Sequence, residues 1–116
     1  MAGLSVGALD REVTIECLVA QGDAGYPTEK WDTLEHGVFM SKVDLRGSEK
    51  FLAGQIAANV DTKWELQWRD DMDPDCLDIP KTRRLVHKGR IFDITAAMMI
   101  GRQDGVRLLT VAGSWL

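Results

Sequence analysis

Residues 60–68 read VDTKWELQW, and the pattern of this stretch decides the fold. Apolar or threonine side chains alternate with charged or amide side chains, which is the period of two of a β-strand with one buried face. Trp64 and Trp68 fall on the same face as Val60 and Leu66. Each large aromatic ring buries on the order of 150–250 Å², so we expect this strand to cross a substantial hydrophobic core.

Similar runs on both sides of this stretch predict five more strands. They cover residues 12–19, 37–45, 82–87, 90–100 and 106–112. Clusters of turn-forming residues separate the strands, and no β-α-β crossover pattern occurs. Six strands punctuated by turns favour a mainly β protein, a small antiparallel β-barrel or a sandwich, and we expect the barrel.

Two of the intervening segments are expected to be loops, and the chain end is open to two interpretations. QGDAGYPTEKW (residues 21–31) is longer than a tight hairpin needs and predicts an exposed loop, after which Trp31 returns the chain to the core. RDDMDPDCLDIPK (69–81) contains two prolines and five aspartates and predicts a second loop. GSWL (113–116) is either a tail or a docking segment.

One short helix is expected in the long connection between the second and third strands. LRGSEKFLAGQIAA (residues 45–58) offers Ser48 as an N-cap, and Phe51, Leu52 and Ile56 form a narrow apolar stripe. A helix of about eleven residues is not stable alone in water. The stripe must therefore pack against another part of the barrel or a partner.

The bulk composition indicates a small globular protein. We expect residues 1–9 to be a flexible N-terminal segment and residues 10–116 to be one domain. The net charge of −4 disfavours a protein that grips nucleic-acid phosphates. No apolar run approaches the roughly 20 residues of a membrane span, and the first residues do not resemble a secretory signal. These features predict a soluble, intracellular protein.

The reactive side chains suggest neither an enzyme nor a cofactor. Cys17 and Cys76 match no zinc spacing and are expected to be reduced thiols. His36 and His87 do not stand at metal-ligand or nucleophile spacing from either cysteine, and His87 is expected at the surface beside a turn. We therefore expect no catalytic, cofactor-binding or metal-binding residues.

The acidic loop is the one candidate for a hard cation, and the pattern argues against it. Asp71, Asp73 and Asp75 alternate as in a calcium loop, but Cys76 stands where such a loop needs glycine, and Pro74 intrudes. A solvated acidic loop, to which Asp70 also belongs, is the simpler interpretation.

A basic stretch leaves a second class of function open. KTRRLVHKGR (residues 81–90) indicates either a solvated strand face or a surface for an acidic partner or a DNA backbone. With Trp64 and Trp68 exposed as a stacking platform, the chain could be a barrel that binds single-stranded nucleic acid. The strict alternation around both tryptophans favours a core position instead.

Taken in order, several motifs resemble the phage head–tail joining family of head-closure, stopper and adaptor proteins. The resemblance covers about residues 9–113. The matching pieces are the opening strand (Arg11 to Ile15), a segment leading into the helix (Gly47, Glu49 and Gln55), an aromatic–arginine pair (Trp68 and Arg69) and a late strand motif (Gly89 to Ile94).

This resemblance implies a structural virion protein of the neck, assembled in the host cytoplasm. Copies would form a homo-oligomeric ring between a portal or adaptor protein above and a tail terminator or tail tube protein below. The ring would close the DNA-filled head, let double-stranded DNA pass without sequence-specific binding and provide the surface on which the tail docks. A different neck or tail-completion protein, such as a tail terminator, is the alternative.

The resemblance also suggests which residues meet partners. The helix stripe would pack on the barrel or a neighbouring subunit, and its polar side chains would face a partner ring or the channel. The expected interface residues are Glu49, Lys50, Phe51, Leu52, Gln55 and Ile56. The loop residues Asp70, Asp71, Asp73 and Asp75 are expected to face a partner or the channel. A net acidic subunit suits a conduit for a polyanion better than a DNA binder.

Overall fold

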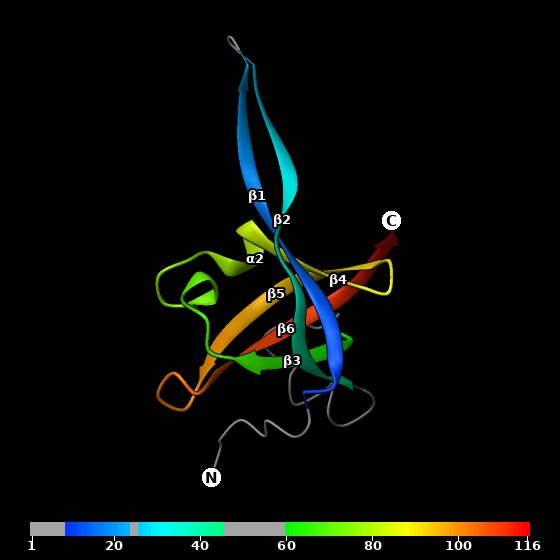
Figure 1. Ribbon diagram of the computed structural model, residues 1–116, viewed down its shortest axis with the longest axis vertical. Helices are drawn as coiled ribbons and strands as arrows, with labels where there is room; N and C mark the ends of the chain where they lie inside the picture. The colour runs from blue at the N-terminus through cyan, green and yellow to red at the C-terminus, as the bar shows by residue number, and fades with distance from the viewer. Residues whose placement is uncertain (1–8, 24–25, 46–59) are drawn as a thin grey trace.

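The computed structural model of the protein describes residues 9–23, 26–45 and 60–116, and it is dominated by six strands (Figure 1). The strands are β1 (Arg11–Asp23), β2 (Tyr26–Asp44), β3 (Thr62–Gln67), β4 (Arg83–His87), β5 (Arg90–Ile100) and β6 (Gly105–Trp115). Two single-turn helices, η2 (Asp70–Met72) and α2 (Ile79–Thr82), lie between β3 and β4.

The six strands form a closed antiparallel barrel, which confirms the predicted fold class. The order around the barrel is β1-β2-β3-β6-β5-β4, and β4 closes it by pairing with β1 from Thr14 to Cys17. Sequential strands are joined by hairpins where the sequence predicts tight turns. In the β4–β5 turn, Lys88 and Gly89 both have positive φ (51° and 80°), as a two-residue hairpin requires.

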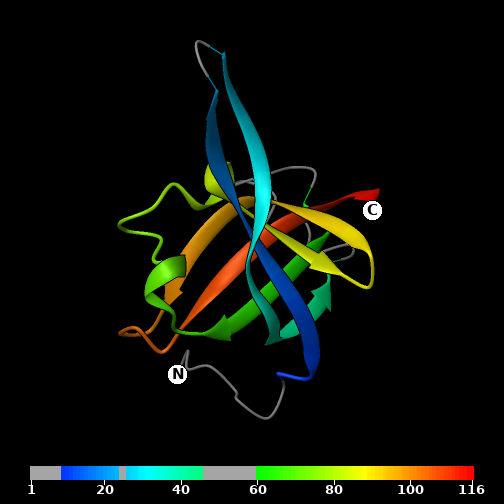
Figure 2. The same ribbon diagram turned by 45° about the horizontal axis from the view of Figure 1, so that its top comes forward.

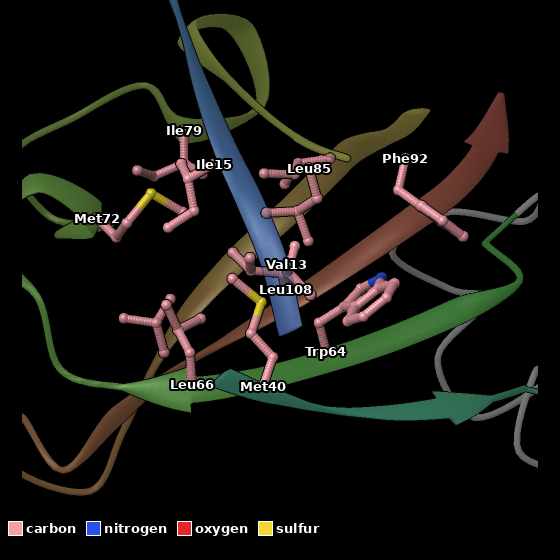
Figure 3. Close-up of a cluster of buried hydrophobic side chains, with 12 residues drawn as sticks. Val13, Ile15, Met40, Trp64, Leu66, Met72, Ile79, Leu85, Phe92 and Leu108 are labelled. Carbon is pink, nitrogen blue, oxygen red and sulfur yellow. The ribbon is translucent and has the colours of Figure 1, made fainter. Parts of the chain in front are cut away.

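The barrel interior is filled by one cluster of buried apolar side chains (Figure 3). Trp64 and Leu66 are fully buried from β3, which confirms the face predicted by the alternation in that strand. Met72 and Ile79 close one end of the cluster, while Trp64 and Phe92 lie at the other end. The remaining members are Val13, Ile15, Met40, Leu85, Ile94, Val106 and Leu108.

β1 and β2 continue beyond the barrel as a two-stranded arm, so the prediction of a loop over residues 21–31 is wrong. The two strands pair without interruption from Glu16↔Thr33 to Asp23↔Tyr26. The arm projects well away from the other strands in both views (Figures 1 and 2). Of the turn-forming residues in this segment, Gly22, Asp23 and Pro27 are themselves paired within the two strands.

A bulge in β2 lies where the arm meets the barrel. Between Val13↔Val38 and Glu16↔Thr33 the register shifts twice, so β2 carries extra residues opposite β1. Gly37 has φ +67°, a conformation open to glycine and costly for residues with a Cβ. The predicted start of the second strand at residue 37 therefore marks a bulge within a longer strand.

A second bulge changes which side chains of β5 face the barrel interior. The alternation within residues 90–100 predicts that Phe92, Ile94, Ala96, Met98 and Ile100 share one face. The register with β6 shifts between Ile94 and Ala96. Beyond the shift, Ala96 and Met98 pack against a separate cluster outside the interior, formed by Leu45, Val60 and Leu109. The prediction of one continuous face is therefore wrong beyond Ile94.

The connection between β3 and β4 is a loop, as predicted, but it contributes to the core. The side chains of Met72 and Ile79 have no exposed surface. The helix expected within residues 45–58 lies almost wholly outside the described residues. At the other end of the chain, β6 extends past the predicted residue 112 to Trp115.

Candidate interaction surfaces

The predicted helix interface lies outside the described residues, but both ends of its connection are visible. Glu49, Lys50, Phe51, Leu52, Gln55 and Ile56 all belong to the undescribed segment. The Leu45 amide donates a 2.9 Å hydrogen bond to the Asp61 carbonyl, and Asp44 pairs with Thr62. The connection therefore leaves and re-enters the barrel at one point.

The acidic loop is organised by its own contacts. Arg69 donates hydrogen bonds to both carboxylate oxygens of Asp71, at 2.9 and 2.8 Å, and these bonds lower the pKa of Asp71. The Trp68 indole donates a 3.0 Å hydrogen bond to Asp70. The Asp73 carboxylate accepts one from the Asp75 amide at 2.9 Å. The carboxylates of Asp70, Asp71 and Asp73 thus each bind a group within the loop, and Asp70 and Asp75 are exposed.

Neither cysteine is paired with a second cysteine. Cys17 is half-buried and Cys76 is exposed, and both thiols are free, as predicted. A hydrogen bond to the Asp73 carboxylate raises the pKa of Cys76, so a smaller fraction of this thiol is ionised to the reactive thiolate. Among the described residues, no three Asp, Glu, His or Cys side chains gather as a metal ion would require.

His87 is buried, so its predicted surface position is wrong. It is only 7% exposed and lies on the inward face of β4, two residues after the buried Leu85. Its ring meets the Trp64 ring edge-on, with centroids 5.3 Å apart, and lies 6.5 Å from the Phe92 ring. Burial, with the nearby cations of Lys42, Lys88 and Arg11, lowers the pKa of His87.

The basic stretch is largely occupied by contacts within the chain. The Arg84 guanidinium binds the Glu16 carboxylate at 2.6 Å and covers the Trp31 ring at 4.6 Å from its centroid. Arg83 donates to the backbone carbonyls of Asp71 and Thr82. These arginines brace the base of the arm and the β3–β4 loop, and they do not line a continuous basic groove.

The arm is a candidate surface that sequence reasoning misses. Beyond Cys17, β1 pairs only with β2, and β3 pairs with β2 only from Met40 to Asp44. Both outer backbone edges of the arm are therefore unpaired by strands of the described chain, and such edges readily accept another chain.

Two exposed apolar patches stand out on the described surface. At the end of β6, Trp115 is 67% and Leu116 is 74% exposed. On β2, Phe39 is 55% exposed and borders a hollow of about 290 Å³. This β2–β3 hollow is lined by Glu35, Gly37, Val38, Phe39, Gln67, Trp68 and Arg69. Large apolar side chains that stay in water commonly mark docking sites.

The described chain is thus a small closed β-barrel with a filled interior, a projecting two-stranded arm and exposed apolar side chains. The chain matches the phage head completion protein family over residues 4–112, and it belongs to that family. This confirms the resemblance to phage head–tail joining proteins. It is a bacteriophage structural protein of head closure. No curated protein matches the chain significantly.

The same fold occurs in a solved structure. The solution structure of protein SF1141 from Shigella flexneri 2a superposes with a TM-score of 0.72 and is 18% identical in sequence. The match covers 96% of this chain and 98% of that one. At this identity the likeness concerns the fold alone. Within the described residues, no helix is long and apolar enough to cross a membrane.

Proposed function

We propose that copies of this protein form a ring in the virion neck that closes the DNA-filled head and presents the tail docking surface. The family match over residues 4–112 carries this proposal. The portal or its adaptor protein lies above the ring, and the tail terminator or tail tube protein lies below. Double-stranded DNA passes through the ring without sequence-specific binding. The protein has no catalytic role.

The arrangement of side chains supports a docking role. Large apolar side chains from all six strands fill the barrel interior. The arm is a two-stranded ribbon, and such ribbons are marginally stable without a further partner. Contact with a sister copy or an adjoining ring would cover its open edges. The net charge of −4 suits a subunit that DNA must pass without being retained.

The alternative of a single-stranded nucleic-acid-binding barrel finds little support. Base stacking needs exposed aromatic rings, but Trp64 is fully buried and Trp68 packs against the core. Arg83 and Arg84 are engaged within the chain. A tail terminator is the remaining alternative. A tail terminator would bind the end of the tail, whereas a head-closure protein would bind the DNA-filled head.

The decisive experiment mixes the purified protein with DNA-filled, tailless heads of the parent phage. Electron microscopy is expected to show added density at the portal vertex, and nuclease protection is expected to show retained DNA. Purified tails, incubated in parallel, serve as the control. Binding to tail ends with no binding to heads would favour the tail terminator.

A further inference from the structure

We infer that Trp115 of one copy inserts into the β2–β3 hollow of the next copy, so that neighbouring subunits join head to tail. This inference rests on the proposed ring and names the surfaces that build it. Exposed apolar groups and an open hollow occur on the same chain, and such a pair of unlike surfaces makes a heterologous contact, the type that generates rings.

The two surfaces cannot meet within one copy. Gln67, which lines the hollow, pairs with Gly105 at the start of β6. Trp115 lies at the other end of the same strand. At about 3.3 Å per residue, the ten intervening steps separate the two surfaces by roughly 30 Å. In Figures 1 and 2 the chain end and the end of β3 lie on opposite sides of the barrel.

The end of β6 is presented as a fixed anchor. Trp115 pairs with Arg90, and the Leu116 amide donates a 2.7 Å hydrogen bond to the Gly89 carbonyl. The Arg90 guanidinium lies 5.2 Å from the centroid of the Trp115 ring and donates to the Gly113 carbonyl. The backbone of Trp115 is therefore held in the sheet while its indole remains exposed to water. Tryptophan and arginine are among the residues most enriched at the energetic centre of interfaces.

The hollow offers a matching environment. Val38, Phe39 and Trp68 supply apolar walls, and its volume of about 290 Å³ can hold an aromatic side chain. Glu35 stands at its rim with a side chain that is 52% exposed and lies 3.9 Å from the Arg69 guanidinium. Arg69 binds the Asp71 carboxylate more closely, at 2.8 Å, so the two carboxylates together exceed its single charge. The Arg90 cation that accompanies Trp115 can approach the Glu35 carboxylate, so the two surfaces are complementary in charge as well as polarity.

Cross-linking on assembled heads tests this contact. Cys17 and Cys76 are replaced by serine, and the exposed positions of the two surfaces receive cysteines through Gln67→Cys and Ser114→Cys. A short bismaleimide is expected to give a ladder of covalent oligomers on heads. Adding Trp115→Ala should remove the ladder and weaken head binding at least tenfold, while Arg102→Ala, in an exposed turn, should leave both unchanged.

The outcomes separate this inference from the proposed function. Normal head binding and DNA retention without a ladder would overturn the Trp115 contact and leave the ring in place, as would a full ladder in the Trp115→Ala protein. Failure of the unmodified protein to bind heads would contradict the proposed function, and the contact with it. Circular dichroism and thermal unfolding establish that each variant is folded.

Discussion

The Trp64 indole donates a 3.0 Å hydrogen bond to the Thr110 hydroxyl inside the barrel, across the β3–β6 pair. The Thr110 hydroxyl in turn donates to the Thr62 carbonyl at 3.2 Å. Both side chains are fully buried. The largest aromatic residue of the core therefore has its one polar atom satisfied by a residue on the neighbouring strand, which fixes its orientation as well as its burial.

Replacing Thr110 with valine should destabilise the protein by about 1–3 kcal/mol, because the buried indole N–H loses its acceptor while the side-chain volume is kept. Urea denaturation measures the change in the free energy of unfolding. Thr110→Ser, which keeps the hydroxyl, is the matched control and should lose less. A Thr110→Val protein as stable as the parent, with a loss only in Thr110→Ser, would show that the methyl group matters and the hydrogen bond does not.

Replacing Arg84 with alanine should loosen the base of the arm. The Arg84–Glu16 pair is largely buried, with 18% and 15% of the two side chains exposed, and Arg84 also covers Trp31. We expect a loss of about 1–3 kcal/mol, as for other hydrogen bonds to charged groups, with faster amide exchange in the arm. Arg84→Lys keeps the charge but lacks the planar group that stacks on Trp31. Its stability should therefore lie between those of the unchanged protein and Arg84→Ala.

Hydrogen exchange followed by mass spectrometry locates this effect. Peptides that contain Val19 and Lys30, which pair across the arm, should exchange faster in Arg84→Ala, while peptides from β3 and β6 should not. Arg102→Ala controls for the loss of a surface charge. A uniform increase over the whole barrel would mean that Arg84 supports the fold in general.

The strands of the barrel could be predicted because each carries its own burial pattern. In β3 the alternation of apolar and polar residues follows directly from the two faces of the strand, and Trp64 shows the result. The bulge after Ile94 could not be predicted, since inserting one residue in a strand depends on the partner β6 and leaves no local signal. His87 lies two residues after Leu85, so the period of a strand places both on the same inward face. The polarity of histidine favours a surface position instead.

The arm was missed because it lacks such a pattern. Glu29 and Lys30 are exposed, and the pairing of β1 with β2 there depends on backbone hydrogen bonds, to which composition gives little clue. The hollow beside Phe39 and Trp68 combines β2 with the end of β3, so only the closed barrel brings its walls together. The sequence predicted where the acidic loop lies. It could not predict that Arg69 donates two hydrogen bonds to Asp71 within that loop.

Stability should fall as the pH drops from 7 to 5, and His87 should account for the change. Because the folded protein holds the pKa of His87 below its ordinary value of 6.5, the unfolded chain takes up a proton at a higher pH than the folded chain does. More protons on the unfolded state mean that stability rises with pH. The contribution is therefore present above pH 6.5 and is lost as the pH falls below it.

Thermal unfolding at several pH values tests the assignment to His87. His87→Gln should flatten the dependence between pH 7 and pH 5. His36→Gln, which removes an exposed histidine on β2, should leave the slope as it is. A slope that persists in His87→Gln would assign the pH dependence to other groups.

Replacing Gly37 with alanine should cost about 1–2 kcal/mol, which is the penalty for a residue with a Cβ in the left-handed region. Gly37 has φ +67°, and an added Cβ would lie 3.1 Å from a Glu12 carboxylate oxygen. Gly37→Asn should lose less, because asparagine tolerates this conformation. If backbone strain at the bulge sets the cost, alanine is the worse of the two in urea denaturation. Equal losses would mean instead that crowding against Glu12 decides, and Glu12→Ala should then rescue both variants.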